Sequence, residues 1–254
     1  MIRLVASLVA LVCATLAWAA TDARKSGFDY MSPATQAMQS DDSQNPAMLW
    51  LQDGEALWNR ATGARAQSCA GCHGDAKTGM KGVAARYPAF DPMLNRPISL
   101  SERINLCRTR NQQAEALKPE SEALLGIEAY VAHQSRGMPV ARSDDPRMKP
   151  FVERGEKLFK QRIGQLDLSC AQCHDERAGE KLAGSVIPQA HPTGYPIYRL
   201  EWQTIGSLQR RLRNCITGVR SDPYPFGALE LIELELWLNR RAAGMKIETP
   251  AVRP

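Results

Sequence analysis

Hydrophobic residues recur at helical spacing in three stretches of the chain, and polar or turn-forming residues bound each stretch. The first stretch follows Asn45, which can cap a helix that has Pro46 at its first position. The second predicted helix spans about residues 121–135, and the third spans about residues 227–243. The apolar positions of the first and third stretches are Met48, Leu49, Leu51, Leu57, Trp58, Leu229, Ile232, Leu236 and Trp237. The pattern predicts a mainly α fold built from short helices.

The N-terminus carries the pattern of an export signal. Arg3 precedes an apolar run from Leu4 to Trp18, and Ala17-Trp18-Ala19 fits a cleavage site, so residues 1–20 are predicted to be a signal peptide. The run is too short for a stable membrane span, and no second long apolar segment follows. We therefore expect a mature protein that is free in the periplasm. Residues 21–44 are polar and lack periodicity, which predicts an arm that lies over the surface or is partly disordered.

The rest of the chain is an internal repeat. Gly54-Glu55-Ala56-Leu57-Trp58 aligns with Gly155-Glu156-Lys157-Leu158-Phe159 at an offset of 101, and the offset grows to 107 or 108 further along. An insertion in the second copy is expected within residues 187–196, which are rich in Pro and Gly. The alignment predicts two tandem domains, at residues 45–145 and 146–254, with a Pro-rich junction at residues 139–150.

Each copy contains the pentapeptide Cys-x-x-Cys-His, at residues 69–73 and 170–174. This motif is typical of covalent haem c attachment, in which both thiols bond to the porphyrin and the His becomes an axial iron ligand. The chain is therefore expected to bind two covalent haem c groups through Cys69, Cys72, Cys170 and Cys173, with His73 and His174 on the irons. The order of helix, haem-attachment turn, long loop and final helix predicts two tandem class I cytochrome c-like domains.

Composition narrows the class of partner. The 254-residue chain is 23% charged and 44% hydrophobic, as expected for a globular protein. Without residues 1–19 it retains 31 basic and 27 acidic residues, a formal charge of only +4. Because there is also no basic stripe interleaved with aromatic residues, nucleic acid is not an expected partner.

The second axial ligand of each iron has three kinds of candidate. His133 and His191 lack a counterpart in the other copy. Met138 and Met245 are counterparts, but they follow the final helix, where a packing role is the simpler interpretation. The remaining candidates are the paired cysteines Cys107 and Cys215. A disulfide between these two is the alternative in an oxidising compartment, yet their equivalent positions favour one ligand for each haem.

An arginine stands four residues before each of these cysteines, as Arg103 and Arg211. A guanidinium one helical turn from a thiolate can lower the thiol pKa and hold an oxyanion. Arg210, Arg213 and Arg220 have no such recurrence and are interpreted as a solvated basic helix face.

With these residues placed, the chain resembles the SoxA family, the dihaem subunits of the SoxAX cytochromes of thiosulfate oxidation. The resemblance covers nearly all of the mature chain. It includes the arm sequences at residues 26–30 and 39–42, Asn45-Pro46, both haem motifs, both lone cysteines and Arg211-Leu-Arg-Asn-Cys215.

The resemblance implies that His73 and Cys107 ligate the first iron, and His174 and Cys215 the second. It also implies that Cys215 is the catalytic residue, modified to a persulfide, and that Arg211 binds substrate. The implied reaction is the oxidative conjugation of thiosulfate to a cysteine thiol of a SoxYZ-type carrier protein, with a SoxX-type monohaem subunit as partner.

Two other functions remain open from the residues alone. A dihaem electron carrier would use Met138 and Met245 as ligands and would make no bond. A dihaem peroxidase would need a vacant iron face and usually a longer chain.

Overall fold

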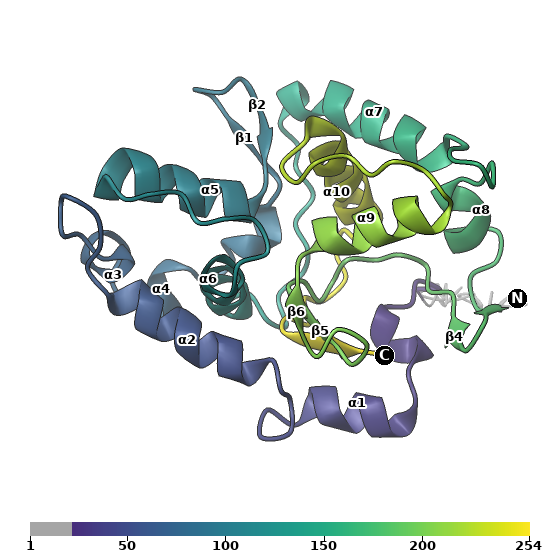
Figure 1. Cartoon of the computed structure of the whole chain (residues 1–254), viewed down its shortest axis with the longest axis horizontal. Coiled ribbons are helices and arrows are strands. Elements are labelled where there is room, and N and C mark those ends of the chain that lie inside the picture. Colours follow the sequence, from purple (N-terminus) through teal and green to yellow (C-terminus); the bar gives the residue numbers. More distant parts are fainter. Residues whose placement is uncertain (1–21) are drawn as a thin grey trace, which may run out of the picture.

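The computed structural model describes residues 22–254, so the predicted signal peptide, residues 1–20, lies outside the described residues. Two helical units lie side by side along the longest axis (Figure 1). Short strands gather between them, and the N-terminal arm runs beneath. The predicted mainly α architecture with two similar units is confirmed.

The first unit begins with a long helix and ends with another. Between them lie the first haem motif, a small hairpin and the helix that carries Cys107. Its elements are α2 (Met48–Asn59), α3 (Cys69–His73), α4 (Ala76–Gly79), η2 (Ala84–Arg86), β1 (Ala89–Asp91), β2 (Arg96–Ile98), α5 (Leu100–Cys107), the π-turn η3 (Arg108–Gln112) and α6 (Glu122–His133).

The second unit repeats the first helix, the haem turn, the hairpin, the cysteine helix and the last helix, lacks counterparts of α4, η2 and η3, and adds two features. A hairpin of β3 and β4 lacks a counterpart in the first unit, and it precedes residues 187–196, so the extra length begins earlier than predicted. A final strand, β7, lies beside β5. The elements are η4 (Pro146–Met148), α7 (Lys149–Lys160), α8 (Cys170–His174), β3 (Lys181–Leu182), β4 (Ser185–Val186), β5 (Ile197–Arg199), β6 (Thr204–Gly206), α9 (Leu208–Gly218), α10 (Leu229–Arg241) and β7 (Ala251–Arg253).

The first and last helices of each unit cross at a glycine. A Cβ on Gly54 of α2 would lie 2.1 Å from the carbonyl oxygen of Gly126 on α6. In the second unit, a Cβ on Gly155 of α7 would lie 2.0 Å from the carbonyl oxygen of Glu233 on α10. Only glycine permits this approach, since real side chains do not come so close to a backbone oxygen. The Gly-Glu pair that recurs in the sequence therefore marks the helix crossing.

The predicted helix ends are largely correct. Ser121 caps α6 by accepting a hydrogen bond from the Leu124 amide, as its position suggested. Helix α2, however, starts at Met48, two residues later than predicted. Asn45 accepts from the Ala47 amide at 3.0 Å and donates to the Pro250 carbonyl at 2.9 Å. It thus ties the start of the first domain to the C-terminal segment.

The described part of the arm is ordered. It forms η1 (Gly27–Tyr30) and the helix α1 (Pro33–Ser40), which its polar sequence did not predict. Gln39 is buried, and its side-chain oxygen accepts a hydrogen bond from the Val252 amide of β7 at 3.0 Å. The arm therefore lies over the surface, the first of the two predicted alternatives.

The two units are joined by non-local contacts. The three-stranded sheet, of order β6-β5-β7, belongs to the second unit, yet it packs against α2 and α6 of the first. That shared core contains Ala47, Leu51, Leu125, Ala129, Tyr198, Ile205 and Val252. The segments that follow α6 and α10 also pair, with an antiparallel bridge between Pro139 and Lys246. The contact between the two units therefore includes both a shared core and paired backbone segments.

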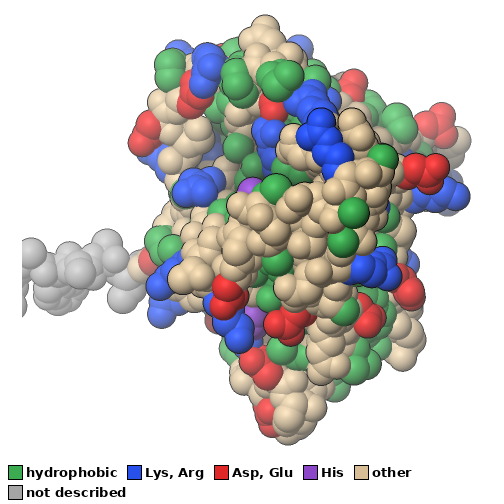
Figure 2. Space-filling model, turned by 90° about the vertical axis from the view of Figure 1, so that its left-hand side faces the viewer, with side chains coloured by type: hydrophobic (Ala, Val, Ile, Leu, Met, Phe, Trp, Pro, Cys, Tyr) green, Lys and Arg blue, Asp and Glu red, His purple; other side chains and the backbone are tan. Residues whose placement is uncertain are grey.

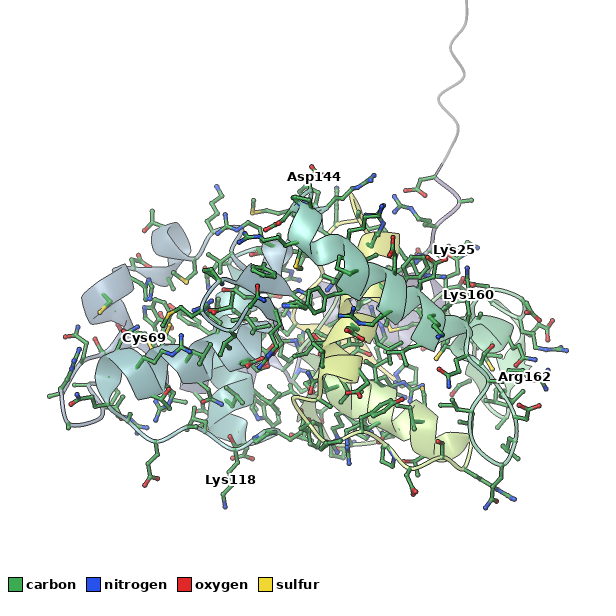
Figure 3. The ribbon with its side chains drawn as sticks, turned by 90° about the horizontal axis from the view of Figure 1, so that it is seen from above. Lys25, Cys69, Lys118, Asp144, Lys160 and Arg162 are labelled. Carbon is green, nitrogen blue, oxygen red and sulfur yellow. The ribbon has the colours of Figure 1, made fainter. Side chains whose placement is uncertain are left out.

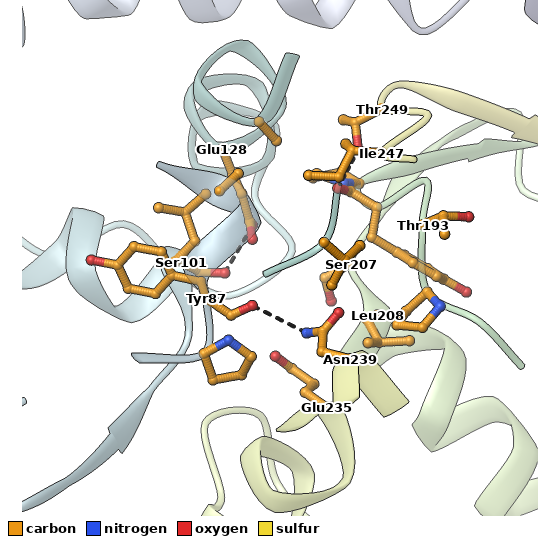
Figure 4. A pocket seen from close by; sticks show the side chains of 18 of the residues that line it. Tyr87, Ser101, Glu128, Thr193, Ser207, Leu208, Glu235, Asn239, Ile247 and Thr249 are labelled. Carbon is orange, nitrogen blue, oxygen red and sulfur yellow. Dashed lines mark hydrogen bonds between the residues drawn. The ribbon is translucent and has the colours of Figure 1, made fainter. Parts of the chain in front are cut away.

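A small cavity between the units contains two equivalent glutamates (Figure 4). Glu128 of α6 accepts a hydrogen bond from the Ser101 hydroxyl at 2.8 Å, and Glu235 is its counterpart on α10. Burial raises the pKa of Glu128 to about 7. Burial, with the charge of Glu128 nearby, raises the pKa of Glu235 to about 8. Both carboxyls favour the neutral form in this cavity.

Among residues 22–254, none of the helices combines the length and the apolar character that crossing a lipid bilayer requires.

We predict that Gly155→Ala lowers the free energy of unfolding of the haem-loaded protein by about 1–3 kcal/mol, because the new methyl group forces α7 away from α10. Denaturant titration followed by circular dichroism measures the change. Gly184→Ala is the control, since a Cβ there meets no atom within 4 Å. An equal effect of the two substitutions would show that the crossing tolerates a side chain.

The glutamate pair predicts a pH dependence. A carboxyl of ordinary pKa about 4.3 in the unfolded chain binds its proton more tightly in the fold, so it stabilises the fold at low pH and loses that contribution as pH rises through 7 and 8. We expect Glu235→Gln to flatten the decline of the unfolding free energy between about pH 5 and 8. Glu153→Gln, on the exposed side of α7, should leave the decline unchanged.

Candidate functional site

The two haem-attachment motifs form short helical turns near opposite ends of the molecule, α3 in the first domain and α8 in the second (Figure 1). Viewed from above, Cys69 lies toward one end and Arg162, in the loop before the second motif, at the other (Figure 3). A serine caps each turn: Ser68 accepts from the Gly71 amide at 2.9 Å, and Ser169 accepts from the Gln172 amide at 3.2 Å. The caps start a helical turn at the first cysteine of each motif.

The loop before each motif is fastened to the helix that carries the lone cysteine. In the second domain, the amides of Gln165 and Leu166 donate to the carbonyls of Arg220 and Val219, directly after α9. Gly164, at φ +70°, makes this approach possible, because a Cβ there would lie 2.1 Å from the Val219 oxygen. Residues 63–65 make the equivalent contacts with residues 112 and 113 in the first domain. These contacts hold the cysteine helix against the motif.

The second motif brings together Cys170, Cys173, His174 and Cys215. The half-buried Cys215 lies on α9, and its charge adds to burial in raising the pKa of the Cys170 thiol to about 11. The Nδ1 atom of His174 lies 2.7 Å from the Pro188 carbonyl oxygen. As the donor in this bond, Nδ1 leaves Nε2 free to bind a metal. Burial lowers the pKa of His174, and Arg211 and Arg241 lower it further, which favours the neutral ring.

The first motif brings together Cys69, Cys72, His73 and Cys107. Cys107 is the last residue of α5; burial raises the pKa of its thiol and Arg103 opposes this. The His73 ring lies 5.8 Å from the Trp58 ring, and within the described part of the chain it has no carbonyl partner like that of His174. Figure 2 shows this side of the molecule, where basic side chains edge a hollow that contains hydrophobic ones.

The six described cysteines are all free thiols. Cys107 and Cys215 each face their own haem motif, so the alternative of a disulfide between them has no support in the structure.

The other candidate ligands have different neighbours. His133 lies 3.3 Å from the Thr249 carbonyl oxygen, and His191 lies 2.7 Å from that of Lys25. Met138 and Met245 sit in the paired segments of the domain junction, where Met245 packs against Ala85, Val140, Ala242 and Ile247. These contacts favour packing roles for both methionines.

Each site provides apolar surroundings and an unsatisfied polar atom, as a large flat cofactor requires. In the second domain, Cys170 and Ala171 pack with Phe159, Leu234 and Leu238. The buried Nε1 of Trp237, in the same cluster, has no hydrogen-bond partner. In the first domain, Cys69 packs against the cluster of Leu100, Ile104 and Leu124. Gln112 lies 3.9 Å from the Cys69 sulfur, and its side-chain oxygen has no partner. Both sets of residues fit a haem c.

The two equivalent arginines have different partners. Arg103 forms an ion pair with Asp91 at 2.5 Å, and Asp91 is almost fully buried. Arg211 forms no ion pair within the described residues, although it is well shielded from solvent. Burial alone would lower its pKa, but the charges of Cys215, Tyr195 and Glu201 outweigh burial and raise it. The positive charge beside Cys215 is therefore available to a ligand.

The sequence interpretation missed Arg199, at the end of β5. Burial and the charge of Arg211 lower its pKa, which places it near that guanidinium. At the offset of 108 that aligns Arg103 with Arg211, Arg199 aligns with Asp91. Comparing the charges of the two copies would have found it.

The three flanking arginines remain outside the site's chemistry. Arg210 stacks on Trp202 at 4.2 Å from the ring centre, and Arg213 stacks on Phe226 at 4.5 Å. Arg220 is exposed. The predicted solvated face therefore holds for Arg220, whereas Arg210 and Arg213 are partly buried against aromatic rings.

Comparison with known proteins adds independent information. Residues 53–140 and 154–247 both match the family described as "SoxA/TsdA, cytochrome c domain". The "L-cysteine S-thiosulfotransferase subunit SoxA" of Pseudaminobacter salicylatoxidans is 36% identical over 90% of this chain and 80% of that protein. The Rhodovulum sulfidophilum protein of the same name is 33% identical over 91% of this chain and 81% of its own length.

A solved structure agrees with these matches. The crystal structure of SoxXA from P. pantotrophus superposes with a TM-score of 0.88 at 30% identity, covering 91% of this chain and 87% of that one. The predicted cytochrome c fold of both domains is confirmed, and with it haem c as the cofactor.

Proposed function

The chain belongs to the SoxA family, and we propose that it is the dihaem subunit of an L-cysteine S-thiosulfotransferase that works at Cys215. One observation carries this proposal: Arg211 presents an unneutralised, largely buried positive charge beside a cysteine that faces a haem motif. A dianion such as thiosulfate would be drawn to this charge and held next to the sulfur.

We propose that each domain holds one covalent haem c. Cys69 and Cys72 would attach the first, with His73 and Cys107 on its iron. Cys170 and Cys173 would attach the second, with His174 and Cys215 on its iron. The capped helical turn of each motif, the orientation of His174 by Pro188 and the cysteine facing each motif support this assignment.

The reaction joins the outer sulfur of thiosulfate to a carrier cysteine. A carrier thiol and thiosulfate together yield a carrier S-thiosulfonate, one proton and two electrons, so that an S–S bond forms and an S–H bond breaks. Haem c, when bound, can accept these electrons. Arg211 orients the oxyanion end, and Cys215, carried as a persulfide, offers the sulfur at which the exchange occurs.

The partners and the localisation that we propose follow from the family. The carrier would be a SoxYZ-type protein, and a SoxX-type monohaem subunit would complete the enzyme; the solved structure of the relative is that of SoxXA. Residues 1–20 would direct the chain to the periplasm. The mass of a Cys215 peptide would detect the persulfide as one additional sulfur atom.

The second domain is the better candidate for the chemistry. In the first domain, Asp91 already neutralises Arg103, so an incoming anion would have to displace a buried carboxylate. The first haem would then serve as a relay or a structural group. The electron-carrier alternative is less well supported, since Met138 and Met245 lie in the junction pairing.

We predict that Cys215→Ala abolishes thiosulfate-dependent reduction of an acceptor cytochrome, because the reacting sulfur is lost. The haems should stay covalently bound, since Cys170 and Cys173 are untouched, and the low-spin thiolate signal in electron paramagnetic resonance should decrease. Met138→Leu and Met245→Leu are controls that should leave signal and activity intact. Retained activity in Cys215→Ala would refute the catalytic assignment, and loss of the signal in a methionine variant would refute the ligand assignment.

We predict that Arg211→Gln lowers kcat/KM for thiosulfate by roughly 10- to 100-fold, the loss expected when a charged hydrogen bond to an anion is removed. Arg220→Gln removes an exposed charge near the end of the same helix and should change kcat/KM less than about threefold. Steady-state assays at constant ionic strength make the comparison. Equal losses would reduce Arg211 to general surface charge.

A further inference from the structure

Arg199 occupies in the second domain the position that Asp91 holds in the first. Asp91 is the last residue of β1 and pairs in register with Arg96, while Arg199 is the last residue of β5 and pairs with Thr204. In both domains, the next helix carries the arginine and the lone cysteine (Figure 1). The duplicated scaffold therefore presents a carboxylate in one copy and a guanidinium in the other.

In the first domain this position neutralises the site. Asp91 is only 3% exposed at its side chain, and it holds Arg103 in an ion pair at 2.5 Å. The backbone amide of Leu94, together with Arg103, keeps the pKa of Asp91 below its usual range. The charges of Arg103 and Asp91 cancel, which leaves no surplus positive charge for an anion.

In the second domain this position places a second arginine near Arg211. The Arg199 side chain is 12% exposed, and its guanidinium lies 5.3 Å from the Trp202 ring centre. Glu201 is its one ion-pair partner in the described chain, at 2.8 Å from Nε, yet that carboxylate is half exposed and the contact is not aligned as a hydrogen bond. A buried donor without a proper acceptor is costly.

Arg211 lies beside Cys215 and Arg199 lies near Arg211, so this domain holds two largely buried guanidiniums where the first domain holds one. Arg211 and Arg199 repel each other, and Tyr195 lies near both and near Cys215. Replacing Asp91 by Arg199 changes the charge at this position by two units, and the half-exposed Glu201 beside Arg199 offsets one of them. The planar forks of two arginines suit the oxygen atoms of a sulfonate group.

We propose that Arg199 and Arg211 together bind the sulfonate group of thiosulfate and direct its outer sulfur toward Cys215. This inference rests on the proposed function and assigns to Arg199 a substrate-binding role. It also explains the unpaired Nε of Arg199, which gains an acceptor when the anion arrives. The first domain has no second arginine at this position, so thiosulfate is excluded from it.

The test compares Arg199→Gln with Arg210→Gln in the complete haem-loaded enzyme. Both arginines stack on Trp202, so the second variant controls for lost packing and lost charge. We expect Arg199→Gln to raise KM for thiosulfate roughly 10- to 100-fold with a smaller change in kcat. Arg199→Lys should recover part of the loss. Arg199→Asp should raise KM more than Arg199→Gln does, since the new carboxylate would pair with Arg211 as Asp91 pairs with Arg103.

A second readout separates this inference from the proposed function. Isothermal titration with thiosulfate alone measures binding without turnover, and Arg199→Gln should weaken it by a factor similar to the KM change. An inactive wild-type enzyme that still binds thiosulfate through Arg199 would contradict the proposed function and support the site. If the KM and the dissociation constant of Arg199→Gln for thiosulfate lie within about twofold of those of Arg210→Gln, the proposed site is wrong, whatever the activity of the wild type.

Discussion

The close crossing of the first and last helix of each domain is the constraint on which the rest of the structure depends. At Gly54 and Gly155 the helices approach until a backbone oxygen fills the space of a missing side chain. The crossing sets how closely the first helix packs on the last one, and the loop that follows the first helix contacts the segment after the cysteine helix. Those loop contacts hold Cys107 and Cys215 against their motifs. The helix crossing and these loop contacts together set the position of each lone cysteine relative to its motif.

On this common scaffold the two copies differ chiefly in electrostatics. Both have a capped haem turn, an equivalent hairpin and an arginine one helical turn before a cysteine. The residue at the end of the preceding strand, Asp91 or Arg199, decides whether that arginine is neutralised or joined by another. The axial histidines show a second difference. The Pro188 carbonyl orients His174, and His73 has no such partner among the described residues. The second domain thereby combines an oriented metal ligand with a second, largely buried guanidinium.

The sequence predicted what depends on local patterns. The haem motifs, the repeat, the helix begun at Ser121 and the pairing of each lone cysteine with a motif all follow from spacing and from the alignment of the two copies. The helix α1 was missed because it is held by distant contacts, such as that between Gln39 and Val252. The late start of α2 has the same cause, since Asn45 is engaged by Pro250. Arg199 was missed because its role depends on the charged residue that lies near it in the fold, Arg211.

The sheet that joins the domains has a consequence for how such a chain can evolve. Strands β5, β6 and β7 belong to the second copy, but their apolar face is covered by α2 and α6 of the first. Deleting the first copy would therefore expose the core of the second to water. Loss of the first haem alone would leave that cover in place. A lineage could discard the cofactor of the first copy long before it could discard the polypeptide, and the first copy would persist as a scaffold for the chemistry of the second.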